Sequence, residues 1–197
     1  LSDIYSARKF HEIARASALL QSQLLQPIGA YSVQPHVRET NLGLDSTIGP
    51  NLSSLNEYNT LFSRNQTLIN ATAIVGTHNL VADELVLSGV QNNLAYSFGQ
   101  FSYNTDGHRD NADVNHDIRN AFFQYQISNN FSAQLEYTSR DTLQGDPRQS
   151  QEDGFDPDNR RSLDEETGRL GLHYKMGNHS NLLYSYFYNT RYTTLVN

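Results

Sequence analysis

The stretch that decides the fold is Phe131–Arg140, which reads FSAQLEYTSR. Its apolar side chains stand at every second position, on Phe131, Ala133, Leu135 and Tyr137, and polar side chains fill the positions between them. Successive side chains of a β-strand point to opposite faces of the sheet. The stretch therefore predicts a strand with one apolar face and one polar face.

Six further stretches show the same period of two. In the clearest of them, residues 169–176, the side chains of Leu170, Leu172, Tyr174 and Met176 alternate with glycine and charged residues. The others are residues 69–75, 84–91, 94–103, 118–127 and 182–189. Strands of soluble sheets usually run about 5–6 residues, whereas alternation over about ten residues is typical of membrane β-barrels. We therefore expect an all-β protein, a transmembrane antiparallel β-barrel of which at least seven strands lie here.

The connections between the predicted strands alternate between short and long. Tight turns are expected at residues 91–93, 128–130 and 177–180, and long polar loops at residues 104–117 and 141–166. Outer-membrane barrels have short periplasmic turns and long extracellular loops, which favours the turns in the periplasm and the loops outside the cell. A soluble antiparallel β-domain also alternates and is the other interpretation of this pattern.

The composition supports a barrel and excludes several other classes. The apolar fraction of 37% is low for a soluble core, yet 12 Tyr and 9 Phe are spread over regular segments. A net charge of −7 without a basic patch argues against nucleic acid as a partner. The absence of Cys excludes a disulfide framework and a thiolate metal site. No run of about 18 apolar residues is present, so no transmembrane helix is expected.

The first 63 residues differ from the rest. Apolar side chains from Ile4 to Leu25 fall at helical spacing and Pro27 stops the pattern, which predicts a periplasmic helix within residues 1–26. Residues 27–63 contain Pro and Gly without a period, as expected of a linker or a segment near a barrel mouth. Bacterial single-chain barrels have an even number of strands. We therefore expect the barrel part, residues 64–197, to be incomplete in this chain.

Charged side chains alternate on the faces that we expect to point inward on two neighbouring strands. Glu136 and Arg140 belong to one strand, and Arg169, His173 and Lys175 belong to the other. In a barrel these side chains would line the lumen, where they would set the selectivity of a channel or hold a plug by charge. Ordinary interior salt bridges are the alternative.

Two acidic segments are candidates for binding. Asp106, Asp110, Asp113 and Asp117 follow one another in the predicted loop 104–117. Oxygen ligands at such close spacing suit calcium, although the spacing does not match an EF-hand, and a solvated loop is the alternative.

The loop 141–166 is the second acidic segment. It carries Asp153, Asp156 and Asp158, which would form a surface for cations or partners; a solvated loop is again the alternative. No nucleophile elbow, phosphate loop, zinc-protease motif or dinucleotide fingerprint is present, so we expect neither enzymatic activity nor a cofactor.

Five segments together carry a family resemblance. They are Leu20–Pro27 (LQSQLLQP), Asn56–Phe62 (NEYNTLF), Leu87–Val90 (LSGV), Phe98–Gly107 (FGQFSYNTDG) and Asp117–Phe122 (DIRNAF). The set resembles large bacterial outer-membrane proteins in which periplasmic tetratricopeptide repeats precede a barrel similar to that of TonB-dependent receptors.

The resemblance implies a location and a function. The predicted helix would be the end of the repeat array, and residues 27–63 would lead into an outer-membrane barrel. Such a barrel would pass or export a substrate, for instance exopolysaccharide or protein. Its partners would be outer-membrane lipid, lipopolysaccharide, and periplasmic or cell-surface proteins. Two alternatives stay open: a barrel that anchors acidic surface loops, and a TonB-dependent uptake receptor, for whose plug residues 27–63 look too short.

Overall fold

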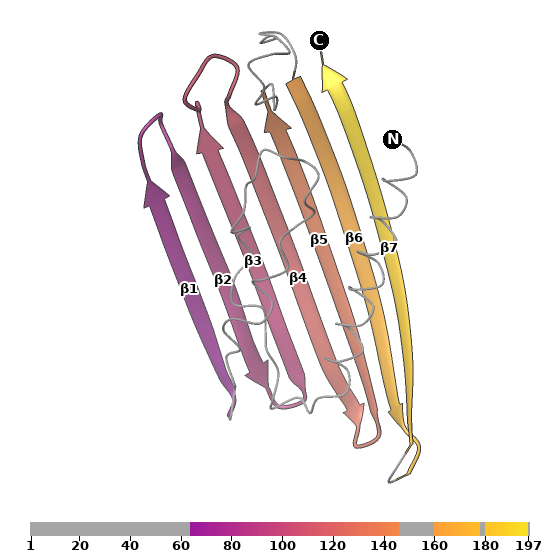
Figure 1. Ribbon diagram of the computed structural model, residues 1–197. Coiled ribbons are helices and arrows are strands. Elements are labelled where there is room, and N and C mark those ends of the chain that lie inside the picture. Colours follow the sequence, from indigo (N-terminus) through magenta and orange to yellow (C-terminus); the bar gives the residue numbers. More distant parts are fainter. Residues whose placement is uncertain (1–63, 146–159, 178–179, 197) are drawn as a thin grey trace.

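Seven antiparallel strands form one sheet in the computed structural model, which describes residues 64–145, 160–177 and 180–196. The strands are β1 (Gln66–Val75), β2 (Val81–Gln91), β3 (Leu94–Thr105), β4 (Val114–Ser128), β5 (Phe131–Gln144), β6 (Arg160–Lys175) and β7 (Asn181–Val196). They lie side by side in chain order, each antiparallel to the next (Figure 1). The predicted all-β antiparallel architecture with seven strands is confirmed for these residues.

Some predictions fall elsewhere in the chain. The predicted helix in residues 1–26 and the linker at 27–63 lie outside the described residues, and so does the middle of the second acidic loop. Within the described part, no helix is long and apolar enough to cross a membrane.

The strands are longer than the sequence pattern predicted. β4 begins at Val114, β5 ends at Gln144 and β6 begins at Arg160. The prediction that residues 104–117 and 141–166 are loops throughout is therefore wrong at their flanks. Both faces of the sheet are polar there, so no apolar alternation marks the strands, yet the backbone hydrogen bonds continue along the neighbouring strands.

Tight turns fix the register at the lower end of the sheet. The turns at Asn92, between β2 and β3, and at Gly177, after β6, contain a residue with positive φ, at 53° and 80°. Asn and Gly adopt this conformation most easily. At the upper end, His78 and Asn79 do the same in the short loop between β1 and β2, with φ of 59° and 54°. The predicted turns at residues 91–93 and 128–130 are thus confirmed, and residues 178–179 of the third lie outside the described residues.

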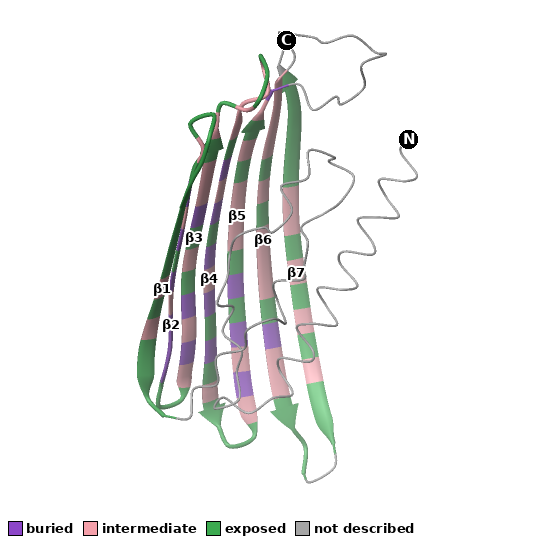
Figure 2. Ribbon diagram, turned by 60° about the vertical axis from the view of Figure 1, so that its left-hand side comes forward, coloured by how far each residue is buried: buried purple, intermediate pink, exposed green. Residues whose placement is uncertain are grey.

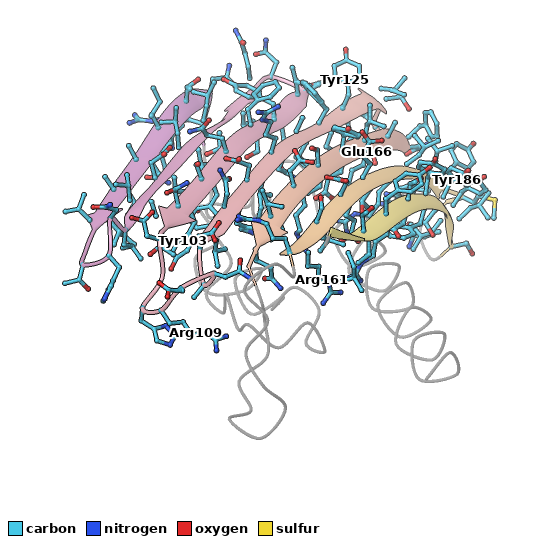
Figure 3. The ribbon with its side chains drawn as sticks, turned by 90° about the horizontal axis from the view of Figure 1, so that it is seen from above. Tyr103, Arg109, Tyr125, Arg161, Glu166 and Tyr186 are labelled. Atoms are coloured by element: carbon cyan, nitrogen blue, oxygen red, sulfur yellow. The ribbon has the colours of Figure 1, made fainter. Side chains whose placement is uncertain are left out.

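The register assigns every side chain to one of two faces. We call a set of directly paired residues, one from each strand, a row. The row through Leu135 contains Thr67, Gly89, Tyr96, Phe123, Leu135, Leu170 and Tyr186. The sheet is curved, and this row lies on its convex face: in Figure 3, Tyr125, Glu166 and Tyr186 point away from the convex side, and Arg161 from the concave side.

Around β4 to β6 the distribution of polarity over the two faces is the reverse of that in a soluble sheet, whereas on β2 to β4 the concave face also buries Ala82, Phe101 and Ile118. Leu135 and Tyr186 on the convex face are each 53% exposed, whereas Gln124 and Gln134 on the concave face are each 1% exposed. Buried residues alternate with exposed ones along the central strands (Figure 2). A soluble sheet packs its apolar face on a core and presents its polar face to water. This sheet presents apolar side chains outward over most of its convex face.

A glycine on the convex face allows one tyrosine to reach across two strands. The Tyr96 ring lies over Gly89, and its hydroxyl lies 2.6 Å from Thr67 Oγ1 on β1. A Cβ atom on Gly89 would lie 2.7 Å from the Gln66 carbonyl oxygen and 2.7 Å from the Tyr96 hydroxyl. Only glycine therefore fits under this ring.

Replacing Gly89 with valine should destabilise the sheet, because the added atoms displace Tyr96 or the β1 backbone. We expect the free energy of unfolding to fall by about 1–3 kcal/mol, measured by urea denaturation with circular dichroism. Gly168→Val is the matched control on the same face, since nothing lies within 4 Å of a Cβ atom there. If the two variants unfold at the same urea concentration, the close approach at Gly89 does not constrain the sheet.

Candidate functional site

Polar side chains from four neighbouring strands form a hydrogen-bonded network on the concave face. They occupy adjacent rows in the middle of β4, β5, β6 and β7. The concave network, as we call it, consists of Asn120, Glu136, Thr138, Arg140, Glu165, Thr167, Arg169 and Asn189.

One half of the network is centred on a buried ion pair. Arg169 Nη2 lies 2.7 Å from Glu136 Oε2, and the two side chains are 11% and 5% exposed. The Asn120 amide donates to Glu136 Oε1 at 3.1 Å and to Thr138 Oγ1 at 2.8 Å. Glu136 therefore has a partner for each carboxylate oxygen. This satisfies the condition under which a charge tolerates burial.

The other half repeats this arrangement with the strands exchanged. Arg140 Nη1 lies 3.5 Å from Glu165 Oε2. The Asn189 amide donates to Glu165 Oε1 at 2.9 Å and to Thr167 Oγ1 at 3.0 Å. In each half, an asparagine on an outer strand links a glutamate and a threonine of the next strand, and the glutamate pairs with an arginine across β5 and β6.

The repeat originates in the sequence. β5 carries Glu136-x-Thr138-x-Arg140, and β6 carries the same pattern as Glu165-x-Thr167-x-Arg169. In the antiparallel register Glu136 pairs with Arg169, Thr138 with Thr167, and Arg140 with Glu165. Two copies of one motif thus face each other around an approximate local twofold axis, and each charge meets its opposite.

The structure places all five predicted lumen residues on the concave face. Glu136 and Arg169 meet each other, whereas Arg140 pairs with Glu165, a residue of the predicted loop 141–166. His173 Nε2 lies 2.9 Å from Asn181 Oδ1 near the lower end of the sheet. Lys175 is exposed there and takes no part in the network.

The four aspartates of the predicted cation-binding loop are not brought together. Asp106 accepts a hydrogen bond from the Asn79 amide at 2.6 Å, and Asp113 pairs with Arg160. Asp110 is exposed in the loop, and Asp117 belongs to β4 on the convex face. In the described ranges, no group of three His, Cys, Asp or Glu residues is placed to hold a metal ion. Asp153, Asp156 and Asp158 lie outside those ranges.

Gln124 is the least satisfied polar side chain of the concave face. It is 1% exposed, and among the described residues neither its Oε1 nor its Nε2 atom has a hydrogen-bond partner. A buried amide in this state costs about 1–3 kcal/mol. This part of the concave face is therefore better suited to contact with water or polar groups than to a dry apolar layer.

Glu165 and Thr167 were missed as site residues, because Glu165 lies in the predicted loop 141–166 and Leu163 is the single large apolar side chain of residues 160–168. Apolar periodicity carries no information in such a segment. The repeated Glu-x-Thr-x-Arg pattern was the signal that could have located them, since antiparallel pairing of two such copies matches opposite charges.

Comparisons of the chain with protein-family models, with curated proteins and with solved structures found no match.

Removing one member of the buried ion pair should be costly. Arg169→Met leaves the Glu136 carboxylate buried without its cation, so we expect the free energy of unfolding to fall by about 3–5 kcal/mol. The readout is the urea midpoint followed by circular dichroism. The double variant with Glu136→Gln should recover much of the loss, because no isolated charge is left.

Lys175→Met is the matched control, since it removes a cation from the same face of the same strand at an exposed position. We expect it to change stability by no more than about 0.5 kcal/mol. Equal losses for Arg169→Met and Lys175→Met would contradict a stabilising role for the buried pair.

Proposed function

We propose that this chain supplies strands of a bacterial outer-membrane β-barrel whose concave face lines a polar passage for a substrate. The observation that carries the proposal is the reversed polarity of the sheet. Apolar side chains cover much of the exposed convex face, whereas the buried concave face carries the polar network on β4 to β7 beside an apolar cluster of Ala82, Phe101 and Ile118 on β2 to β4. Lipid outside a barrel suits the apolar convex face, and water or a polar substrate inside it suits the polar part of the concave face, as in membrane barrels.

The convex face has the chemistry of a lipid-facing surface. Large exposed side chains continue across the strands without a charge in the lower half of the sheet; they include Phe98, Phe123, Tyr125, Leu135, Tyr137, Leu170, Tyr174, Leu182, Tyr184, Tyr186 and Tyr188. Apolar patches of this extent are rare on soluble monomers. Tyrosines near both ends of the band suit the interfacial girdles of a membrane barrel.

The direction of the two edge strands determines how many further strands a closed sheet would need. β1 and β7 occupy the two edges of the described sheet and run in the same direction, because each neighbour is antiparallel to the last. Antiparallel closure therefore requires an odd number of further strands between them. An unpaired strand edge in hydrocarbon costs several kcal/mol per polar group, which favours such closure.

The concave face suits passage of a polar substrate. Charges in its middle are compensated within the concave network, and Lys175 and Arg191 add exposed cations on the same face. The Gln124 amide and the threonine and asparagine side chains of the network offer neutral hydrogen-bonding groups.

A second candidate function is anchoring of a surface-exposed structure, without transport. It is favoured by the acidic upper part of the convex face, where Asp117, Asp141 and Asp164 pair in one row.

A charge on the convex face tests the membrane location. Leu135 is 53% exposed, so in water Leu135→Arg would cost little, whereas in a bilayer an arginine near the midplane costs about 2–4 kcal/mol. We expect this loss for the full-length protein refolded into phospholipid vesicles, measured by urea denaturation. Asp141→Arg, on the same face of the same strand but above the apolar band, should be near neutral. Equal stability of Leu135→Arg and the parent protein would contradict a lipid-facing surface.

Single-channel recording tests the passage. In planar bilayers the full-length protein should conduct, and Lys175→Glu with Arg191→Glu should shift the reversal potential toward cation selectivity, because these side chains lie exposed on the concave face. Arg119→Glu makes the charge change of one of these two substitutions on the convex face and should leave selectivity unchanged. Absence of conductance in the parent protein would favour the anchoring function.

A further inference from the structure

The apolar band on the convex face does not run parallel to the rows. On β1 it covers Ile69–Val75, at the upper end of the strand, whereas on β6 it covers Leu170–Met176, at the lower end. The strands between them carry intermediate positions: Leu85 and Leu87 on β2, Leu94 to Phe98 on β3, Ala121 to Tyr125 on β4, and Phe131 to Tyr137 on β5. β7 does not continue this shift, because its exposed tyrosines extend to Tyr192, near the upper end of the strand.

The register gives the size of this drift. The middle of the β1 band is Thr72, and the row through Thr72 reaches β6 at Glu165. The middle of the β6 band is His173, eight residues further along β6. Over the five steps from β1 to β6, the band thus moves by about 1.6 residues per strand.

Such a drift is the geometric signature of tilted strands. A row is perpendicular to the strands, so in a tilted sheet a level plane crosses successive strands at successively shifted residues. With a rise of about 3.3 Å per residue and a strand spacing of about 4.8 Å, the drift corresponds to a tilt of about 48°. Strands of outer-membrane barrels tilt by about 35–45°.

Polar side chains also stand at the upper boundary of the band. Asp83 on β2 accepts a hydrogen bond from the Gln100 amide on β3 at 2.6 Å, and Gln100 lies two rows below Asp83. Arg119, Ser139 and Glu166 occupy the first polar convex positions of β4, β5 and β6 and share one row with Gln100. Tyr137 donates to Glu166 Oε1 at 3.1 Å and links the band to this boundary.

We infer that the convex band marks a bilayer boundary that crosses the rows obliquely, from the loop between β1 and β2 down to Gly168 on β6. The occupant of the band is the hydrocarbon of the bilayer, since no charged side chain lies within it. The band spans three residues on β2, five on β3 and β4, and seven on β1, β5 and β6, whereas a fully spanning tilted membrane strand needs about 9–11 residues. This inference rests on the proposed membrane location.

One consequence is that the strands extend beyond the membrane boundary by different lengths. β1 and β2 end at the boundary, whereas β5 and β6 continue for about seven residues beyond it, or about 23 Å along the strand. The convex face of this extension carries Asp117, Asp141 and Asp164 in one row. The extension is therefore a paired, acidic wall in water on one side of the barrel.

Residues of a single row give the sharpest test. Ala73 and Asp141 share a row and are both exposed on the convex face, yet the oblique boundary puts Ala73 in lipid and Asp141 in water. Leu135, on the strand of Asp141, should also lie in lipid. This chain contains no Cys, so Ala73→Cys, Asp141→Cys and Leu135→Cys can each be introduced singly into the full-length protein.

The readout is labelling by a membrane-impermeant maleimide on intact cells, normalised to labelling after denaturation. We expect Asp141→Cys to label several-fold more than Ala73→Cys and Leu135→Cys. Equal labelling of Ala73→Cys and Asp141→Cys, with Leu135→Cys protected, would overturn the oblique boundary and leave the membrane location intact. Labelling of Ala73→Cys with protection of Asp141→Cys would also overturn it. Equally strong labelling of all three would contradict the proposed function itself.

Spin labels at the same three cysteines keep the inference testable where a variant does not assemble in cells. In purified full-length protein refolded into phosphatidylcholine vesicles, a lipid-facing label is more accessible to oxygen, and a water-facing label to a soluble nickel complex. Ala73→Cys should behave like Leu135→Cys and unlike Asp141→Cys. The same accessibility at Ala73→Cys and Asp141→Cys would overturn the inference.

Discussion

The sheet depends on the register between β5 and β6, which must be fixed even where no apolar alternation is present. The facing Glu-x-Thr-x-Arg motifs of these two strands fix it. A slip of one residue would move every side chain of a strand to the opposite face. In the upper part of β6 both faces are polar, so the preference of apolar side chains for one face does not oppose such a slip. The slip would separate Glu136 from Arg169 and Arg140 from Glu165. The cost of two buried unpaired charges therefore opposes it.

Much of the fold could be predicted from the sequence, because alternation is strong wherever one face is apolar. Phe131–Tyr137 and Leu170–Met176 are such segments, and the structure confirms strands at both. The strand ends could not be predicted in the same way. Residues 160–168 contain a single large apolar side chain, Leu163, and their strand conformation depends on hydrogen bonds to β5 and β7, which no local pattern reports.

The residues that share the face of the candidate site could be predicted, but the pairs that they form with one another could be predicted only in part. Period two was sufficient to put Glu136, Arg140 and Arg169 on one face, since that requires only counting along each strand. Which side chains meet across strands depends on the register, and Glu165 had been given to a loop. The grouping of the four loop aspartates failed for a related reason: proximity in sequence does not imply convergence when Asp117 belongs to a strand.

The row of Asp117, Asp141 and Asp164 also has a consequence for how the sheet responds to its surroundings. Like charges directly opposite on neighbouring strands destabilise their pairing, and here they face one another across two successive strand pairs. Dissolved ions screen this repulsion, with a Debye length of about 30 Å at 0.01 M and about 3 Å at 1 M ionic strength. The backbone amides of the upper β4–β6 segment should therefore exchange with solvent faster in dilute buffer than in concentrated salt, which makes this row the part of the sheet most responsive to the ionic strength around it.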